Sequence, residues 1–188
     1  LPSLARIFQT TSTQVQMGLS MSMAGLSVGQ VFFGPLSDKY GRRPVLLASL
    51  ILFCFSTVAC IFSPDIVFFN ICRLLQGLGG AGAIVLSRSV ATDCYSGREL
   101  VKTLAIIGAI NGIAPVTAPV IGGLVASSIG WKGIFEILLG IGAVLLILCL
   151  PLKESLDADK KFKGKLPQLF KGFVELLHKR NFNRYVLI

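Results

Sequence analysis

The chain has 188 residues, of which 53% are hydrophobic and only 14% are charged, and its formal net charge is +9. Soluble domains carry about 25% charged residues, so this composition argues against an ordinary soluble domain and favours a protein that lies in a lipid bilayer. The basic balance does not indicate nucleic-acid binding, because most Lys and Arg residues flank apolar segments, as the positive-inside rule expects of a membrane protein.

Five apolar segments are predicted to cross the membrane, each as a helix. In lipid only helices and closed barrels satisfy every backbone polar group, and a barrel would show short alternating segments instead of long apolar runs. The run 44–64 has no charged residue, and at about 1.5 Å per residue it reaches the roughly 30 Å of the hydrocarbon layer. The predicted spans are 15–36, 44–62, 66–91, 103–127 and 133–150, with a turn-like connector at 128–132 between the last two.

The distribution of positive charge predicts the orientation. Segments 37–44, 88–102 and 153–184 hold three, three and nine of the 18 Lys and Arg residues, so we expect them in the cytoplasm. Residues 1–14 then lie outside, which implies that a first helix precedes them if the N-terminus of the protein is cytoplasmic. The predicted organisation is a partial transmembrane bundle at 1–152, a cytoplasmic linker with an amphipathic helix at 153–180, and the start of another span at 181–188.

A compact charged segment, GPLSDKYGRRP, occupies positions 34–44 between two long uncharged runs. A cytoplasmic loop explains its cations, but not the single carboxylate among them or the flanking glycines. A carboxylate there can make charge-assisted hydrogen bonds to helix ends. Glycine permits a close helix approach at Gly34 and a tight turn at Gly41. The residues that we expect to act together are Gly34, Asp38, Lys39, Gly41, Arg42 and Arg43.

An arginine lies inside the third apolar span. Arg73 follows Asp65 by eight residues, which places it about 12 Å below the outer end of a helix. A charge at such depth costs about 2.5–3.5 kcal/mol on insertion scales, so Arg73 should face a cavity or a polar partner, with Gln76 on the same helix face. The residues leave open a structural role, bonded to a carbonyl, and a role in proton coupling. No carboxylate lies at this depth in the chain, so an acidic partner would come from outside it.

Glycine and proline form a stripe along one face of the fourth span, at spacings of four and three residues. Glycine allows close helix packing, and each proline frees a backbone carbonyl and bends the helix. The stripe and the glycine that follows it are Gly108, Gly112, Pro115, Pro119, Gly122 and Gly123. Two further polar residues in the spans, Asn70 and Asn111, either line a substrate path or hold helices together.

The sequence offers little for catalysis. The five cysteines lack metal-ligand spacing, and the chain has neither a phosphate-binding glycine loop nor an arrangement of nucleophile and base. We therefore expect no metal, no cofactor and no enzyme activity.

Three motifs together resemble the major facilitator superfamily. Segment 34–44 is similar to the G-x-x-x-D-[RK]-x-G-R-[RK] loop between the second and third helices of that family, and RLLQG at 73–77 is similar to its R-x-x-Q-G motif in the fourth helix. APVIGG at 118–123 resembles the antiporter motif G-P-x-x-G-G of the fifth helix, with Ala118 in place of the first glycine. The opening LPSL and the repeated Ala-Pro steps resemble the Bcr/CflA drug-resistance branch.

The resemblance implies an all-α, polytopic membrane bundle with the major facilitator fold. The chain would be its amino-terminal half, helices two to six plus the cytoplasmic linker, without most of the first helix and without the carboxy-terminal half. Segment 34–43 would be a gating latch, while Arg73 and Gln76 would serve proton coupling. The implied function is proton-coupled efflux of a drug or another small molecule by alternating access across the bacterial inner membrane. A proton-linked metabolite uptake permease of the same fold and a truncated, non-transporting membrane scaffold remain alternatives.

Overall fold

A computed structural model describes residue 8, residues 10–157 and residue 162, and the regular elements of this part of the chain are all helices. They are α2 (Ser12–Tyr40), α3 (Arg42–Ile61), α4 (Ile66–Cys94) and α5 (Gly97–Cys149). Each is long and apolar enough to cross a membrane. The all-helical prediction is therefore confirmed for the described residues. The amphipathic helix expected within 153–180 and the span expected at 181–188 fall almost entirely outside them.

Local side-chain chemistry explains where the helices begin and end. The Thr11 side chain accepts a hydrogen bond from the Gln14 amide at the start of α2, and the Asp65 carboxylate accepts one of 2.8 Å from the Phe68 amide at the start of α4. These caps satisfy amides that a helix leaves without partners. Between α2 and α3, Gly41 has φ 104°, which confirms the predicted turn.

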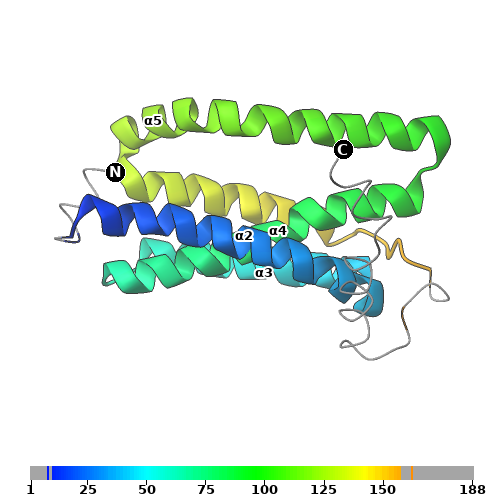
Figure 1. The fold of residues 1–188 in the computed structure, drawn as a ribbon, viewed down its shortest axis with the longest axis horizontal. Helices are drawn as coiled ribbons and strands as arrows, with labels where there is room; N and C mark the ends of the chain where they lie inside the picture. The colour runs from blue at the N-terminus through cyan, green and yellow to red at the C-terminus, as the bar shows by residue number, and fades with distance from the viewer. Residues whose placement is uncertain (1–7, 9, 158–161, 163–188) are drawn as a thin grey trace, which may run out of the picture.

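Helix α5 is bent into two limbs, 97–129 and 131–149. The bend is at Gly130, whose φ of 76° and ψ of −177° lie outside the helical region. The two limbs run in opposite directions like a hairpin (Figure 1). The connector that the sequence predicts at 128–132 is therefore a chain reversal at Gly130, made possible by the glycine, and the last two predicted spans are the two helical limbs on either side of it.

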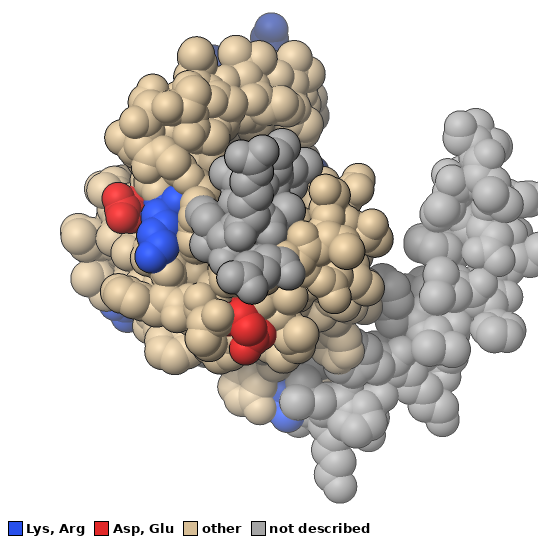
Figure 2. Space-filling view, turned by 90° about the vertical axis from the view of Figure 1, so that its left-hand side faces the viewer, with Lys and Arg blue, Asp and Glu red and all other residues tan. Residues whose placement is uncertain are grey.

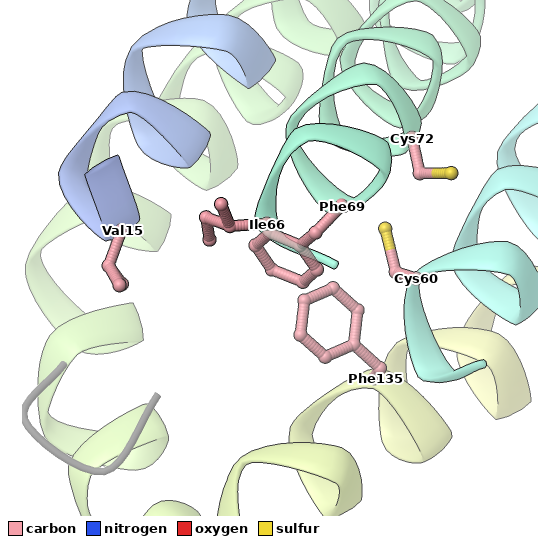
Figure 3. Packing of buried hydrophobic residues seen from close by; sticks show 6 residues of the cluster. All are labelled: Val15, Cys60, Ile66, Phe69, Cys72 and Phe135. Carbon is pink, nitrogen blue, oxygen red and sulfur yellow. The ribbon is translucent and has the colours of Figure 1, made fainter. Parts of the chain in front are cut away.

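Helix α4 is central, because it packs most extensively against α2 and then against α3. The second limb of α5 packs against α3, and a Cβ atom on Gly142 would lie 2.9 Å from the Cys54 sulfur. All four helices supply an apolar cluster near the bend of α5 (Figure 3). Its buried members are Val15, Cys60, Ile66, Phe69, Cys72 and Phe135. A second cluster, nearer the other end, consists of Phe33, Val45, Leu46, Leu50, Ala81 and Leu86.

Helices α2 and α4 touch at their backbones. A Cβ atom on Gly25 would overlap the Leu74 carbonyl, and one on Gly77 would overlap the Ser22 carbonyl. Because the two glycines have no side chains, the backbones of α2 and α4 come closer together than a side chain at either position would permit. Gly77 is the glycine of the R-x-x-Q-G sequence, so this motif shapes a helix crossing as well as supplying polar groups.

The first limb of α5 runs along one side of the bundle (Figure 1). Every residue from 108 to 121 is exposed, and a Cβ atom on Gly108, Gly112, Gly122 or Gly123 would meet nothing within 4 Å. Within the described chain no helix packs closely against this glycine and proline stripe, so the close packing that its glycines allow stays a prediction. The close contact lies at the α2–α4 crossing instead, because there two small-residue faces lie opposite each other.

Candidate functional site

Charged side chains gather at one end of the bundle. The α2–α3 turn, the α4–α5 turn and the end of α5 meet there, because the helices alternate in direction. Figure 2 shows the opposite end, where α5 bends, and its described surface is mostly uncharged. The structure contains two polar clusters, one at this charged end around Arg42 and one inside the bundle around Arg73.

The Arg42 cluster joins the ends of α2, α3 and α4. The Arg42 side chain is 10% exposed, and its Nη1 donates to Asp38 Oδ1 at 2.5 Å and to Ser37 Oγ at 2.6 Å. Its Nε donates to Asp93 Oδ2 at 2.9 Å. The Asp38 carboxylate thus makes a charge-assisted hydrogen bond at a helix end, as its position in the sequence suggested, and a second carboxylate, from the end of α4, binds the same arginine. Such charge-assisted bonds hold three helix ends in one arrangement and separate if the ends move apart.

The segment after α5 also reaches the start of α3. The Glu154 carboxylate accepts hydrogen bonds from the backbone amides of Arg42, at 2.8 Å, and Arg43, at 3.3 Å. The Arg43 side chain also contacts the end of α5, because its Nη2 donates to the Leu150 carbonyl at 2.7 Å. Sequence reasoning missed both Asp93 and Glu154, because they lie far from Arg42 along the chain. The one sequence feature that could have indicated them is that both are carboxylates in segments predicted to lie on the same side of the membrane as Arg42.

The other predicted members of the 34–43 segment have different surroundings. Lys39 lies over the Tyr40 ring, with its Nζ 5.5 Å from the ring centroid. The expectation of a close helix approach at Gly34 is wrong, since a Cβ atom there would lie 4.0 Å from Val85, an ordinary contact. The backbones of α2 and α4 touch earlier in α2, at Gly25, and are already farther apart at Gly34.

The Arg73 cluster links all four helices through neutral groups. Arg73 Nη1 donates to Gln76 Oε1 at 2.5 Å, and Nη2 donates to Ser22 Oγ of α2 at 3.0 Å. The Arg73 guanidinium carbon lies 5.7 Å from the centroid of the Phe135 ring, on the second limb of α5. The expected face shared by Arg73 and Gln76 is confirmed, and within the described chain the hydrogen-bond partners of this arginine are uncharged.

The buried Gln76 side chain extends this network to α3, because its Nε2 donates to Thr57 Oγ1 at 2.8 Å. A cavity of about 200 Å³ adjoins the cluster. Its lining residues are Ser22, Met23, Leu26, Phe53, Arg73, Gln76, Gly77, Gly80 and Leu138. A guanidinium that is held by neutral groups beside a cavity can accept a further, anionic partner there.

The two asparagines lie in different places. Asn70 lines a cavity of about 360 Å³ between α2 and α4, and its Nδ2 donates to the Gln14 carbonyl at 3.3 Å. Its Oδ1 is buried and has no hydrogen-bond partner within the described chain. Asn111 is exposed on the first limb of α5 and is not among the residues that line the Asn70 cavity. The structure therefore does not bring the two asparagines to one substrate path.

Comparison with protein families gives one match over the full chain, in which residues 1–188 fit the profile described as Major Facilitator Superfamily. Among curated proteins, "Uncharacterized MFS-type transporter YdgK" of Bacillus subtilis (strain 168) is 36% identical over 189 residues, covering 99% of this chain and 47% of that protein. "Multidrug resistance protein MdtL" of Citrobacter koseri is 30% identical over 159 residues, and this match covers 84% of this chain and 41% of that protein. This chain thus spans less than half the length of these relatives.

A solved structure supports the fold. The crystal structure of the human organic anion transporter MFSD10 (TETRAN) matches with a TM-score of 0.64 and 23% sequence identity. The match covers 79% of this chain and 34% of that one. At this level of identity the likeness concerns the helical arrangement alone.

Proposed function

We propose, from the premise that this chain belongs to the major facilitator superfamily, that it forms the amino-terminal half of a proton-coupled exporter of drugs or similar small molecules. Transport by a multi-pass membrane protein follows from the family and from the four apolar helices. Efflux is favoured by the similarity to multidrug resistance proteins and by the Pro-x-x-Gly-Gly sequence at 119–123. The Bcr/CflA branch, the bacterial inner membrane and a cytoplasmic location of the charged end belong to the same proposal.

The observation that carries the proposal is the Arg73 cluster. A partly buried cation with neutral partners beside a cavity is an unusual arrangement in a membrane bundle. A carboxylate from a part of the transporter outside this chain would pair with Arg73 when ionised and release it when protonated. Protonation would then change the interactions at the bundle interior, which is the requirement for coupling proton movement to a conformational change.

The Arg42 cluster supports the second part of the mechanism. In alternating access, two halves of a transporter rock around a central site and expose it to either side in turn. We infer that Asp38, Arg42 and Asp93 form a latch at the cytoplasmic end, where helix ends held together by charge-assisted hydrogen bonds favour one conformation. Lys39 and Arg43 border this latch and contribute to its positive charge.

The proposal is tested with the complete transporter in everted membrane vesicles. When the vesicle interior is acidified by respiration, we expect a fluorescent cationic dye such as ethidium, or another member of a substrate panel, to accumulate inside. A protonophore should abolish the accumulation, and vesicles without the protein should show none. Substrate movement in the same direction as the protons would instead identify an uptake permease of the same fold. Absence of transport across the panel would favour the non-transporting scaffold.

A further inference from the structure

The first turn of α3 lacks a cap from its own sequence neighbour. Its N-cap residue is Gly41, which has no side chain to accept hydrogen bonds from the following amides. The first amides of a helix have no partner within the helix and need one elsewhere. Glu154, more than a hundred residues later, supplies it by accepting from the Arg42 amide at 2.8 Å and the Arg43 amide at 3.3 Å. A carboxylate suits this position, because the N-terminus of a helix carries partial positive charge.

Other contacts tie the same segment to the Arg42 cluster. Arg43 Nη2 donates to the Leu150 carbonyl at the end of α5, at 2.7 Å. The Phe162 amide donates to the Asp38 carbonyl at 3.0 Å, and Ser155 Oγ lies 3.5 Å from Asp93 Oδ2. The segment that leaves the bundle after α5 thus contacts the ends of α2, α3 and α4, and the Glu154 carboxylate accepts two of these hydrogen bonds.

We propose that Glu154 is a positioning residue of the latch. It fixes the first turn of α3 through the backbone, while Asp38 and Asp93 fix the side chain of Arg42 in that turn. Arg42 is therefore held from two directions, and the backbone contact comes from the segment that follows the bundle. A displacement of this segment would move Arg42 relative to its carboxylates. The gating part of this inference rests on the proposed function, whereas the clamp itself does not.

Amide hydrogen exchange in the purified complete transporter tests the clamp. We expect Glu154→Ala to accelerate exchange of the Arg42 and Arg43 amides by roughly threefold to tenfold, because each loses a charge-assisted hydrogen bond. Glu154→Gln, which keeps an acceptor without the charge, should give a smaller increase. Peptides covering the α2–α4 crossing at Gly25 and Gly77 should exchange as in the wild type, which shows that the variant is folded.

A matched control is Glu99→Gln, which removes an exposed carboxylate from the first turn of α5 at the same end of the bundle. It should leave the Arg42 and Arg43 amides unchanged. Unchanged exchange in Glu154→Ala, or an equal increase in Glu99→Gln, would overturn the clamp.

The gating part of the inference is tested by measuring dye transport in vesicles that contain equal amounts of the wild type and of each variant. We expect Glu154→Ala to lower the rate of dye transport, Glu154→Gln to lower it less, and Glu99→Gln to leave it unchanged. Faster amide exchange in Glu154→Ala together with a wild-type transport rate would overturn the coupling of this segment to the gate. A wild type that transports no substrate would instead defeat the proposed function, while the exchange measurement would still decide whether Glu154 clamps α3.

Discussion

The two carboxylates that bind Arg42 differ in their exposure to solvent. The Asp38 side chain is 46% exposed, whereas that of Asp93 is 19% exposed. An exposed ion pair contributes up to about 1 kcal/mol, and removal of one partner from a more buried pair has a larger effect. Asp38→Asn should therefore leave membrane abundance and thermal stability nearly unchanged but shift the gate and slow turnover. Asp93→Asn should in addition destabilise the protein, by about 1–3 kcal/mol.

The measurements are the unfolding temperature of the purified complete transporter and its turnover at equal membrane abundance. Glu99→Gln again serves as the control for loss of a carboxylate at this end. Equal unfolding temperatures for the Asp38 and Asp93 variants would show that the two contacts contribute equally to stability despite their different burial. A normal transport rate in Asp38→Asn would remove this residue from the gate.

At the scale of helices, small residues matter only where another helix lies against them. Gly25→Ala or Gly77→Ala would place a methyl group against a carbonyl of the opposite helix and force α2 and α4 apart. We expect a destabilisation of about 1–3 kcal/mol from this overpacking. Gly112→Ala and Gly122→Ala, on the first limb of α5, should leave the stability of this bundle unchanged or raise it by up to about 1 kcal/mol, since alanine favours a helix over glycine.

Unfolding temperatures of the four variants check this difference, and equal losses at all four positions would contradict it. If the Gly112 and Gly122 variants are stable but transport poorly, the stripe on α5 acts through contacts beyond the described chain.

The same comparison explains how far the sequence predicts the structure. Long uncharged runs separated by polar connectors were sufficient to predict the helices. The position of Arg73 within an apolar run was sufficient to predict that it has polar partners. A stripe with spacings of four and three residues occurs in α2, as Gly18, Ser22, Gly25 and Gly29, and also in α5. Only the α2 stripe is packed within the described chain, because α4 presents Gly77 to it. A local pattern does not specify the opposing surface. For the same reason Asp93 and Glu154 were not predictable as partners of the Arg42 turn.

For the whole molecule, the contacts of Arg73 favour motion of the bundle as one body. Its hydrogen bonds and its ring contact reach α2 and α5, and through Gln76 they reach α3. The backbones of α2 and α4 already touch at Gly25 and Gly77, so these helices have little room to slide. A change at Arg73 would therefore be transmitted to the bundle as a unit, as rocking of one half of a transporter requires.

Substitution of Arg73 tests whether this network couples protons to transport. A planar guanidinium donates to Ser22 and Gln76 from two different nitrogens, and a lysine ammonium does not reproduce that fork. We therefore expect both Arg73→Lys and Arg73→Ala to insert normally, to retain some substrate binding and to lose proton-driven export. The decisive measurement is substrate-induced proton release from the purified complete transporter. Arg88→Lys, an exposed arginine on the same helix, should keep the wild-type proton stoichiometry. If Arg73→Ala also keeps it, Arg73 has no part in coupling, and its hydrogen bonds serve only to hold α2 and α4 together.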